Sequence, residues 1–152
     1  MILLAARNES GERSGVSPPI RRFCTGKLTH AARQFSQLVF VYGSLKRGFA
    51  LHALLQGQLY LGNTVTEPLY RLFDLGSYPG LVEWPDGLAI RGEVYQVDLE
   101  CLLRLDEAEG VADRLYVRRK TLLQSKFQGR DVEAWFWLRA VQGLRDCGSV
   151  WP

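Results

Sequence analysis

The pattern of short β-type segments between residues 38 and 138 constrains the fold of this chain most strongly. Runs rich in branched and aromatic residues alternate with turn signals such as Pro79-Gly80 and Pro85-Asp86-Gly87. The expected strands cover residues 38–42, 59–65, 69–75, 81–84, 90–97, 115–123 and 132–138. Many strands with one clear helix are typical of an α+β domain. We expect a mixed sheet that curls or closes into a small β-barrel with a few short helices.

Local signals predict how some of these segments are joined. We expect residues 81–84 and 90–97 to form a hairpin, the last two strands to join around Gly129, and residues 51–55 to form a short helix or turn. The one clear helix begins after Asp98, a good N-cap, and continues through an apolar stripe to Gly110, a natural stop. Its stripe consists of Leu99, Leu102 and Leu103.

Charge divides the chain into two parts. Its 152 residues suffice for one domain, and the whole carries a net charge of +3. Residues 1–36 contain six Lys/Arg and two Asp/Glu, whereas residues 37–152 contain thirteen and fourteen. We therefore expect residues 1–36 to be a basic, disordered leader and residues 37–152 to be the domain. A targeting segment and a nucleic-acid-binding arm are the alternatives for the leader.

Cysteine usage and hydropathy indicate the compartment. The chain has three cysteines, Cys24, Cys101 and Cys147, with no Cys-x-x-Cys pair and no Cys/His cluster. This argues against a disulfide framework and against a structural zinc site, so we expect a reducing, cytoplasmic environment and no metal. No run reaches eighteen apolar residues, so we expect no membrane span.

A glycine loop directly follows the first expected strand. The segment Tyr42-Gly43-Ser44-Leu45 places a glycine where the backbone can turn sharply and approach a ligand, with amides that can face an anion or oxyanion. Its spacing matches neither a Walker loop nor the turn that carries a nucleophilic serine in hydrolases. A purely structural turn is the alternative.

Two carboxylates at the end of the expected helix are the best candidates for acid–base chemistry. Projected at 100° per residue, Asp106 and Glu109 fall on the apolar side of the helix, in its last turn. Burial and the negative end of the helix dipole both raise a carboxyl pKa, which suits proton transfer near neutral pH. The alternative is that one of them pairs with Arg118 or Arg119.

Weaker candidates lie elsewhere. Tyr78 precedes a turn and its ring could form a wall of a pocket. A hydrolase using Ser44 and His52 would require contact between those side chains. The basic run at residues 118–120 divides between the two faces of a strand, so we expect no nucleic-acid partner.

Five segments, taken in order, resemble the γ-glutamylcyclotransferase-like proteins, which include γ-glutamylamine cyclotransferases and the plant AIG2-like group. The resemblance rests on five motifs: the strand and loop, a segment ending in Tyr-Pro-Gly-Leu-Val, a Gly-Glu-Val-Tyr strand, a Leu-Asp-x-x-Glu helix end and a Tyr-x-Arg strand. They occupy residues 39–48, 72–82, 91–95, 105–110 and 115–119. The resemblance covers about residues 38–138 and leaves residues 1–36 without a counterpart.

The resemblance implies a compact fold built on a small β-barrel and an intramolecular aminolysis. The α-amine of a γ-glutamyl group attacks its own γ-carbonyl and releases 5-oxoproline together with an amine or amino acid. The family's acid–base residue falls on Glu109, and its substrate loop falls on Tyr42, Gly43, Ser44 and Leu45. No metal or organic cofactor is implied.

The chain also differs from the family pattern. It carries Phe136-Trp137 where many relatives have a tyrosine in the final strand, and residues 49–52 lack the polar residue common in relatives that bind γ-glutamylamines. The preferred γ-glutamyl substrate and the oligomeric state therefore stay open. A non-catalytic small-molecule-binding or interaction module of the same fold is the alternative function.

Overall fold

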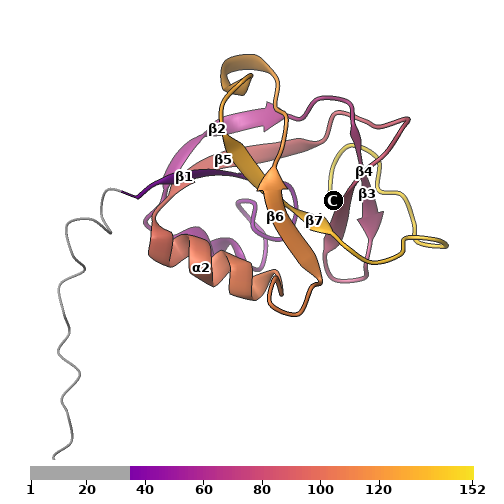
Figure 1. Ribbon diagram of the computed structural model, residues 1–152, viewed down its shortest axis with the longest axis horizontal. Coiled ribbons are helices and arrows are strands. Elements are labelled where there is room, and N and C mark those ends of the chain that lie inside the picture. Colours follow the sequence, from indigo (N-terminus) through magenta and orange to yellow (C-terminus); the bar gives the residue numbers. More distant parts are fainter. Residues whose placement is uncertain (1–34) are drawn as a thin grey trace, which may run out of the picture.

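A computed structural model describes residues 35–152 (Figure 1). The expected leader lies almost wholly outside these residues and stays a prediction. The described chain forms seven strands, one α-helix and two short 3₁₀ helices. In chain order these are β1 (Gln37–Val41), η1 (His52–Leu55), β2 (Leu59–Val65), β3 (Tyr70–Asp74), β4 (Pro79–Glu83), β5 (Arg91–Val97), α2 (Leu99–Ala108), β6 (Tyr116–Lys120), η2 (Ser125–Phe127) and β7 (Val132–Trp137).

Five strands form one mixed sheet in the order β2-β5-β1-β7-β6, and β3 pairs with β4 in a separate hairpin (Figure 1). β1 runs parallel to β7, while the other ladders of the larger sheet are antiparallel. The expected α+β class and mixed sheet are confirmed. Beyond the edge strands, Thr66 and Leu123 form an isolated bridge. Within the described chain β2 and β6 share no ladder, so the expected closed barrel stays a prediction.

The expected hairpin of residues 81–84 with 90–97 is wrong. β4 pairs instead with β3, with Asp74 opposite Pro79, and β5 pairs with both β1 and β2. The turn at Pro85-Asp86-Gly87 carries the chain across the start of β3, where a Cβ on Gly87 would lie 2.3 Å from the backbone of Leu69 and Tyr70. This crossing directs β5 away from β4 and into the larger sheet.

The helix has the predicted ends. The Asp98 side chain accepts a hydrogen bond from Cys101 N at 2.8 Å, and Gly110 adopts φ +64° just past the last turn. The predicted stripe is only partly buried, because Leu102 is covered whereas Leu99 is 38% and Leu103 is 59% exposed. The helix therefore buries a narrower face than the leucine spacing predicts.

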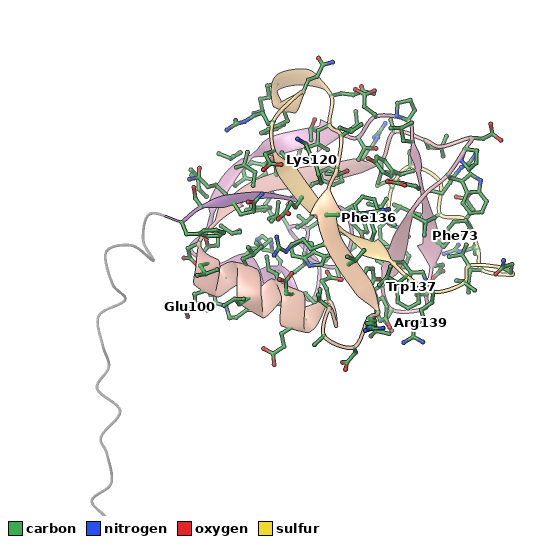
Figure 2. The ribbon with its side chains drawn as sticks, in the orientation of Figure 1. Phe73, Glu100, Lys120, Phe136, Trp137 and Arg139 are labelled. Carbon is green, nitrogen blue, oxygen red and sulfur yellow. The ribbon has the colours of Figure 1, made fainter. Side chains whose placement is uncertain are left out.

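Two hydrophobic clusters pack on opposite faces of β1. Val39 and Val41 belong to the cluster that includes the buried side of α2, while Phe40 and Tyr42 belong to the cluster that includes the β3–β4 hairpin. Trp137, at the end of β7, lies toward that hairpin (Figure 2). The loop that follows β1 consequently emerges where the helix end and the hairpin meet.

Candidate active site

The loop after β1 is held against the β3–β4 hairpin by a contact that only glycine permits. A Cβ on Gly43 would lie 2.5 Å from Pro79 Cγ, well inside the distance that real side chains tolerate. The loop then tightens through a hydrogen bond from Lys46 N to Gly43 O at 3.0 Å. The predicted close approach therefore exists, and its partner is Pro79 of the hairpin.

The loop leaves amide donors free. Among the described residues, the backbone N–H groups of Gly43, Ser44 and Leu45 donate no hydrogen bond to another protein group. Unused donors that succeed one another along a turn can hold an anion or a developing oxyanion. This arrangement agrees with the predicted role of the loop.

Glu109 lies at the C-cap of α2, half-buried, and its carboxylate accepts no hydrogen bond from the described residues. Burial, together with the negative charge of Asp106, raises the pKa of Glu109 to about 7. Near neutral pH such a group is populated in both its protonated and ionised forms, as an acid–base catalyst requires.

Asp106 has very different surroundings. Arg118 Nε donates to Asp106 Oδ1 at 2.9 Å, and Trp135 Nε1 donates to the same oxygen at 2.8 Å. Arg118 also pairs with Glu133. The ion-pair alternative is therefore correct for Asp106 and does not hold for Glu109, since Arg118 and Arg119 have other acidic partners.

One pocket brings the candidate residues together. Its cavity volume is about 20 Å³, and it opens to solvent. Its lining includes Glu109, the four loop residues Tyr42, Gly43, Ser44 and Leu45, and Tyr78, which is 41% exposed. The remaining lining residues are Phe40, Val41, Pro79, Tyr116 and Trp135. The six residues singled out from the sequence thus share one cavity.

Two buried tyrosines fix the walls of this pocket. Tyr116 OH donates to Pro79 O at 2.7 Å, and Tyr42 OH donates to Trp135 O. Burial and the nearby Glu109 charge raise the pKa of Tyr116, and burial, then the charges of Tyr116 and Glu109, raise that of Tyr42. Both phenols therefore stay neutral and act as rigid donors.

Sequence reasoning did not single out Tyr116 or Trp135 as site residues. Tyr116 belongs to the Tyr-x-Arg strand that carried the family resemblance, which was the available signal. Trp135 belongs to β7, where its alternation with apolar neighbours indicated only a strand. Neither Phe136 nor Trp137 lines the pocket, although the Trp137 ring packs edge-on against Tyr116 with centroids 5.1 Å apart.

The serine-hydrolase arrangement is not present in the described residues. His52 Nδ1 lies 3.1 Å from Leu45 O, and no hydrogen bond joins the imidazole to Ser44. Within residues 35–152, no group of three His, Cys, Asp or Glu side chains is arranged to hold a metal ion. Glu109 is the only carboxylate among the described residues that line the pocket.

Comparisons with known proteins agree with this arrangement. Residues 39–149 match the family described as "Gamma-glutamyl cyclotransferase, AIG2-like". A Methanocaldococcus jannaschii protein, provisionally named a gamma-glutamylcyclotransferase, is 37% identical over 102 residues, which are 66% of this chain and 82% of that protein. A similarly named Vibrio cholerae protein is 50% identical over 74 residues, which are 49% of this chain and only 63% of that protein.

Solved structures share the fold. The crystal structure of an AIG2-like protein from mouse has a TM-score of 0.62 at 26% identity and covers 75% of this chain and 87% of its own. A uropathogenic Escherichia coli protein has a TM-score of 0.66 at 22% identity and covers 77% of this chain and 93% of its own, a likeness in fold.

Fold and site together define an α+β protein with a pocket lined by a glycine loop and a helix-end carboxylate. The family match covers most of the chain, and the chain belongs to the gamma-glutamyl cyclotransferase, AIG2-like family. Among the residues described, no helix has both the length and the apolar character needed to cross a bilayer.

Proposed function

We propose that this protein is a γ-glutamylcyclotransferase that releases 5-oxoproline from a γ-glutamyl amine or γ-glutamyl amino acid. The observation that carries the proposal is Glu109, an unpaired carboxylate with its pKa near 7 in the pocket that the loop amides also line. Family membership supports the reaction class, and the pocket supplies the groups that the reaction needs.

Glu109 is proposed to move one proton through the reaction. Its ionised form accepts a proton from the substrate's α-ammonium group, and the free amine then attacks the γ-carbonyl carbon to form the new C–N bond. That proton passes from Glu109 to the departing nitrogen as the old C–N bond breaks, so the carboxylate is regenerated. The ring nitrogen, still positively charged after the attack, gives its second proton to the released amine, which leaves as an ammonium ion. Because the attack closes a five-membered ring within one molecule, orientation supplies much of the rate.

The loop is proposed to hold the γ-glutamyl end of the substrate. The free amides of Gly43, Ser44 and Leu45 can receive negative charge as the carbonyl oxygen becomes tetrahedral. Tyr42 fixes the base of the loop, and the exposed ring of Tyr78 covers the mouth of the pocket. These roles account for each lining residue that the sequence pointed to.

The finer features of the proposal follow from the same chemistry. Proton transfer by Glu109 and charge stabilisation by amides require no metal or organic cofactor, so activity should survive dialysis against EDTA. We place the reaction in the cytoplasm on the strength of the thiol usage, with Cys101 buried and reduced. We also propose that the curled sheet, joined beyond its edges at Thr66 and Leu123, is the barrel of the family.

The proposal is tested by incubating the full chain with a panel of γ-glutamyl amines and dipeptides and measuring 5-oxoproline. Release from at least one substrate, abolished by Glu109→Gln without a fall in melting temperature, is the expected result. Failure of the whole panel, together with tight binding of a γ-glutamyl compound, would favour the alternative of a non-catalytic binding module.

A further inference from the structure

A groove separate from the Glu109 pocket contains a buried cation without an acidic partner. The groove has a volume of about 420 Å³ and lies over the paired strands β2 and β5. Lys46, Asn63, Thr64, Arg91, Glu93 and Ser125 contribute to its lining, with Val65 and Gly92. None of these residues lines the Glu109 pocket. The groove lies within the size range of small-molecule sites.

Lys46 is the unusual residue of this groove. Only 9% of the residue is exposed, yet within the described chain its ammonium forms no salt bridge. It donates to Trp151 O at 3.0 Å and lies 4.7 Å from the centroid of the Phe49 ring. Buried lysines are rare unless paired, because removing the charge from water is costly. Burial accordingly lowers the pKa of Lys46, with Glu93 acting in the opposite direction.

The nearest acid of the groove is already used. Glu93 accepts hydrogen bonds from Arg47 Nε at 3.2 Å, from Arg47 N at 3.2 Å and from Tyr95 OH at 2.9 Å. These bonds occupy both carboxylate oxygens, and the ion pair of Glu93 is with Arg47. Lys46 feels the Glu93 charge but forms no salt bridge with it, so its ammonium can still pair with an anion from outside the described residues.

The other polar groups of the groove are mostly donors. Arg91 is exposed, and its guanidinium contacts no acidic side chain of the described chain. Asn63 Oδ1 accepts from Tyr60 OH at 2.8 Å, which leaves the amide nitrogen to donate. With Glu93 paired to Arg47, the cations and free donors of the groove match an anion.

We propose that this groove is a binding site for a small anion, a carboxylate or a phosphate, held by Lys46 and Arg91. The site goes beyond the proposed cyclotransferase function and does not depend on it. Lys46 directly follows the substrate loop, and its N–H bonds Gly43 O at 3.0 Å. An anion on Lys46 therefore sits one residue from the amides of the Glu109 pocket.

The test is calorimetric titration of the full chain at constant ionic strength, first with inorganic phosphate and then with succinate. We expect one saturable site for at least one of the two anions. The anion that binds more tightly shows whether the site prefers a phosphate or a carboxylate. Arg91→Gln, an exposed change, should weaken Kd about tenfold or more, as loss of a charge-assisted contact does. Lys46→Met should abolish binding while the chain stays folded by circular dichroism.

Two controls locate the site. Arg104→Gln removes an exposed cation on α2, outside the groove, and should leave Kd unchanged. Glu109→Gln should also leave Kd unchanged, because that residue belongs to the other pocket. Absence of saturable binding by both anions, equal affinity in Arg91→Gln, or loss of binding in Glu109→Gln would each overturn the proposal. None of these readouts requires 5-oxoproline release, so a failure of the anion-site proposal can be told apart from a failure of the cyclotransferase proposal.

Discussion

Two carboxylates at the carboxyl end of α2, Asp106 and Glu109, lie in opposite surroundings. On the side facing β6 and β7, Asp106 accepts bonds from Arg118 and Trp135. On the side facing the glycine loop, Glu109 accepts none from the described residues and has its pKa raised to about 7. Three residues therefore separate a carboxylate bound by an arginine and an indole from one that has no hydrogen-bond partner in the described chain and can exchange a proton. The comparison shows that partners decide which acid is available for chemistry.

Replacing Glu109 with Gln gives the largest expected effect on this comparison. The amide keeps the shape of the side chain and cannot accept or return a proton, so 5-oxoproline release should fall by about 10²–10⁴-fold. The melting temperature should stay the same or rise slightly, since a half-buried charge is removed. Glu107→Gln, on an exposed neighbour in the same turn, is the matched control and should keep full activity. Turnover that survives Glu109→Gln would refute the acid–base role.

Gly43→Ala tests the loop that lines the Glu109 pocket. In Gly43→Ala the new Cβ would meet Pro79, so the loop or the hairpin must move. We expect a loss of about 1–3 kcal/mol in the free energy of unfolding, as overpacking causes, and a fall in activity. Urea unfolding and 5-oxoproline release measure the two effects.

Ser44→Ala is the control for that loop change, because it keeps the backbone amides and removes only a hydroxyl. It should retain most of the activity if the amides, rather than the serine side chain, hold the substrate. A Gly43→Ala variant as stable and active as the parent protein would show that the close approach to Pro79 is not needed.

Neutralising Asp106 tests the other side of the helix end. Asp106→Asn weakens the bonds to Arg118 and Trp135 and should cost about 1–3 kcal/mol of unfolding free energy. Because the Asp106 charge helps to raise the pKa of Glu109, the variant should also move the acidic limb of the pH–activity profile toward lower pH. Glu133→Gln, which loosens Arg118 without removing a charge from α2, is the control. An unchanged pH–activity profile in Asp106→Asn would show that the Asp106 charge does not influence the pKa of Glu109.

The local parts of this picture were predictable from the sequence, and the long-range parts were not. The strand at residues 59–65 and the helix ends at Asp98 and Gly110 matched their predictions, because alternation and capping act between near neighbours. The partner of residues 81–84 was wrong, since β5 takes its partners from β1 and β2 rather than from the preceding strand.

For the site, too, the local features were predictable and the long-range contacts were not. The helix projection placed Asp106 and Glu109 on one side of α2 but could not assign Arg118 to one of them, because that choice depends on where β6 lies. The glycine pattern and the helix projection pointed to the loop and to both acids, and the family motifs then chose Glu109 as the acid–base residue. Trp135 enters the pocket from the far end of the chain, and only the packing of β7 beside β1 brings it there.

The last expected effect is a pH dependence of stability that belongs to Glu109 alone. Its pKa is raised on folding from an ordinary 4.5 to about 7, so between these values the folded protein binds more protons than the unfolded chain. Stability contributed by the protonated form is complete below pH 4.5 and is lost as the pH rises through about 7. Glu109→Gln cannot titrate. Relative to the parent, the variant should therefore gain about 1–3 kcal/mol between pH 4.5 and 7.5 in urea unfolding. Parallel curves for the two proteins would mean that Glu109 ionises as freely in the pocket as in the unfolded chain.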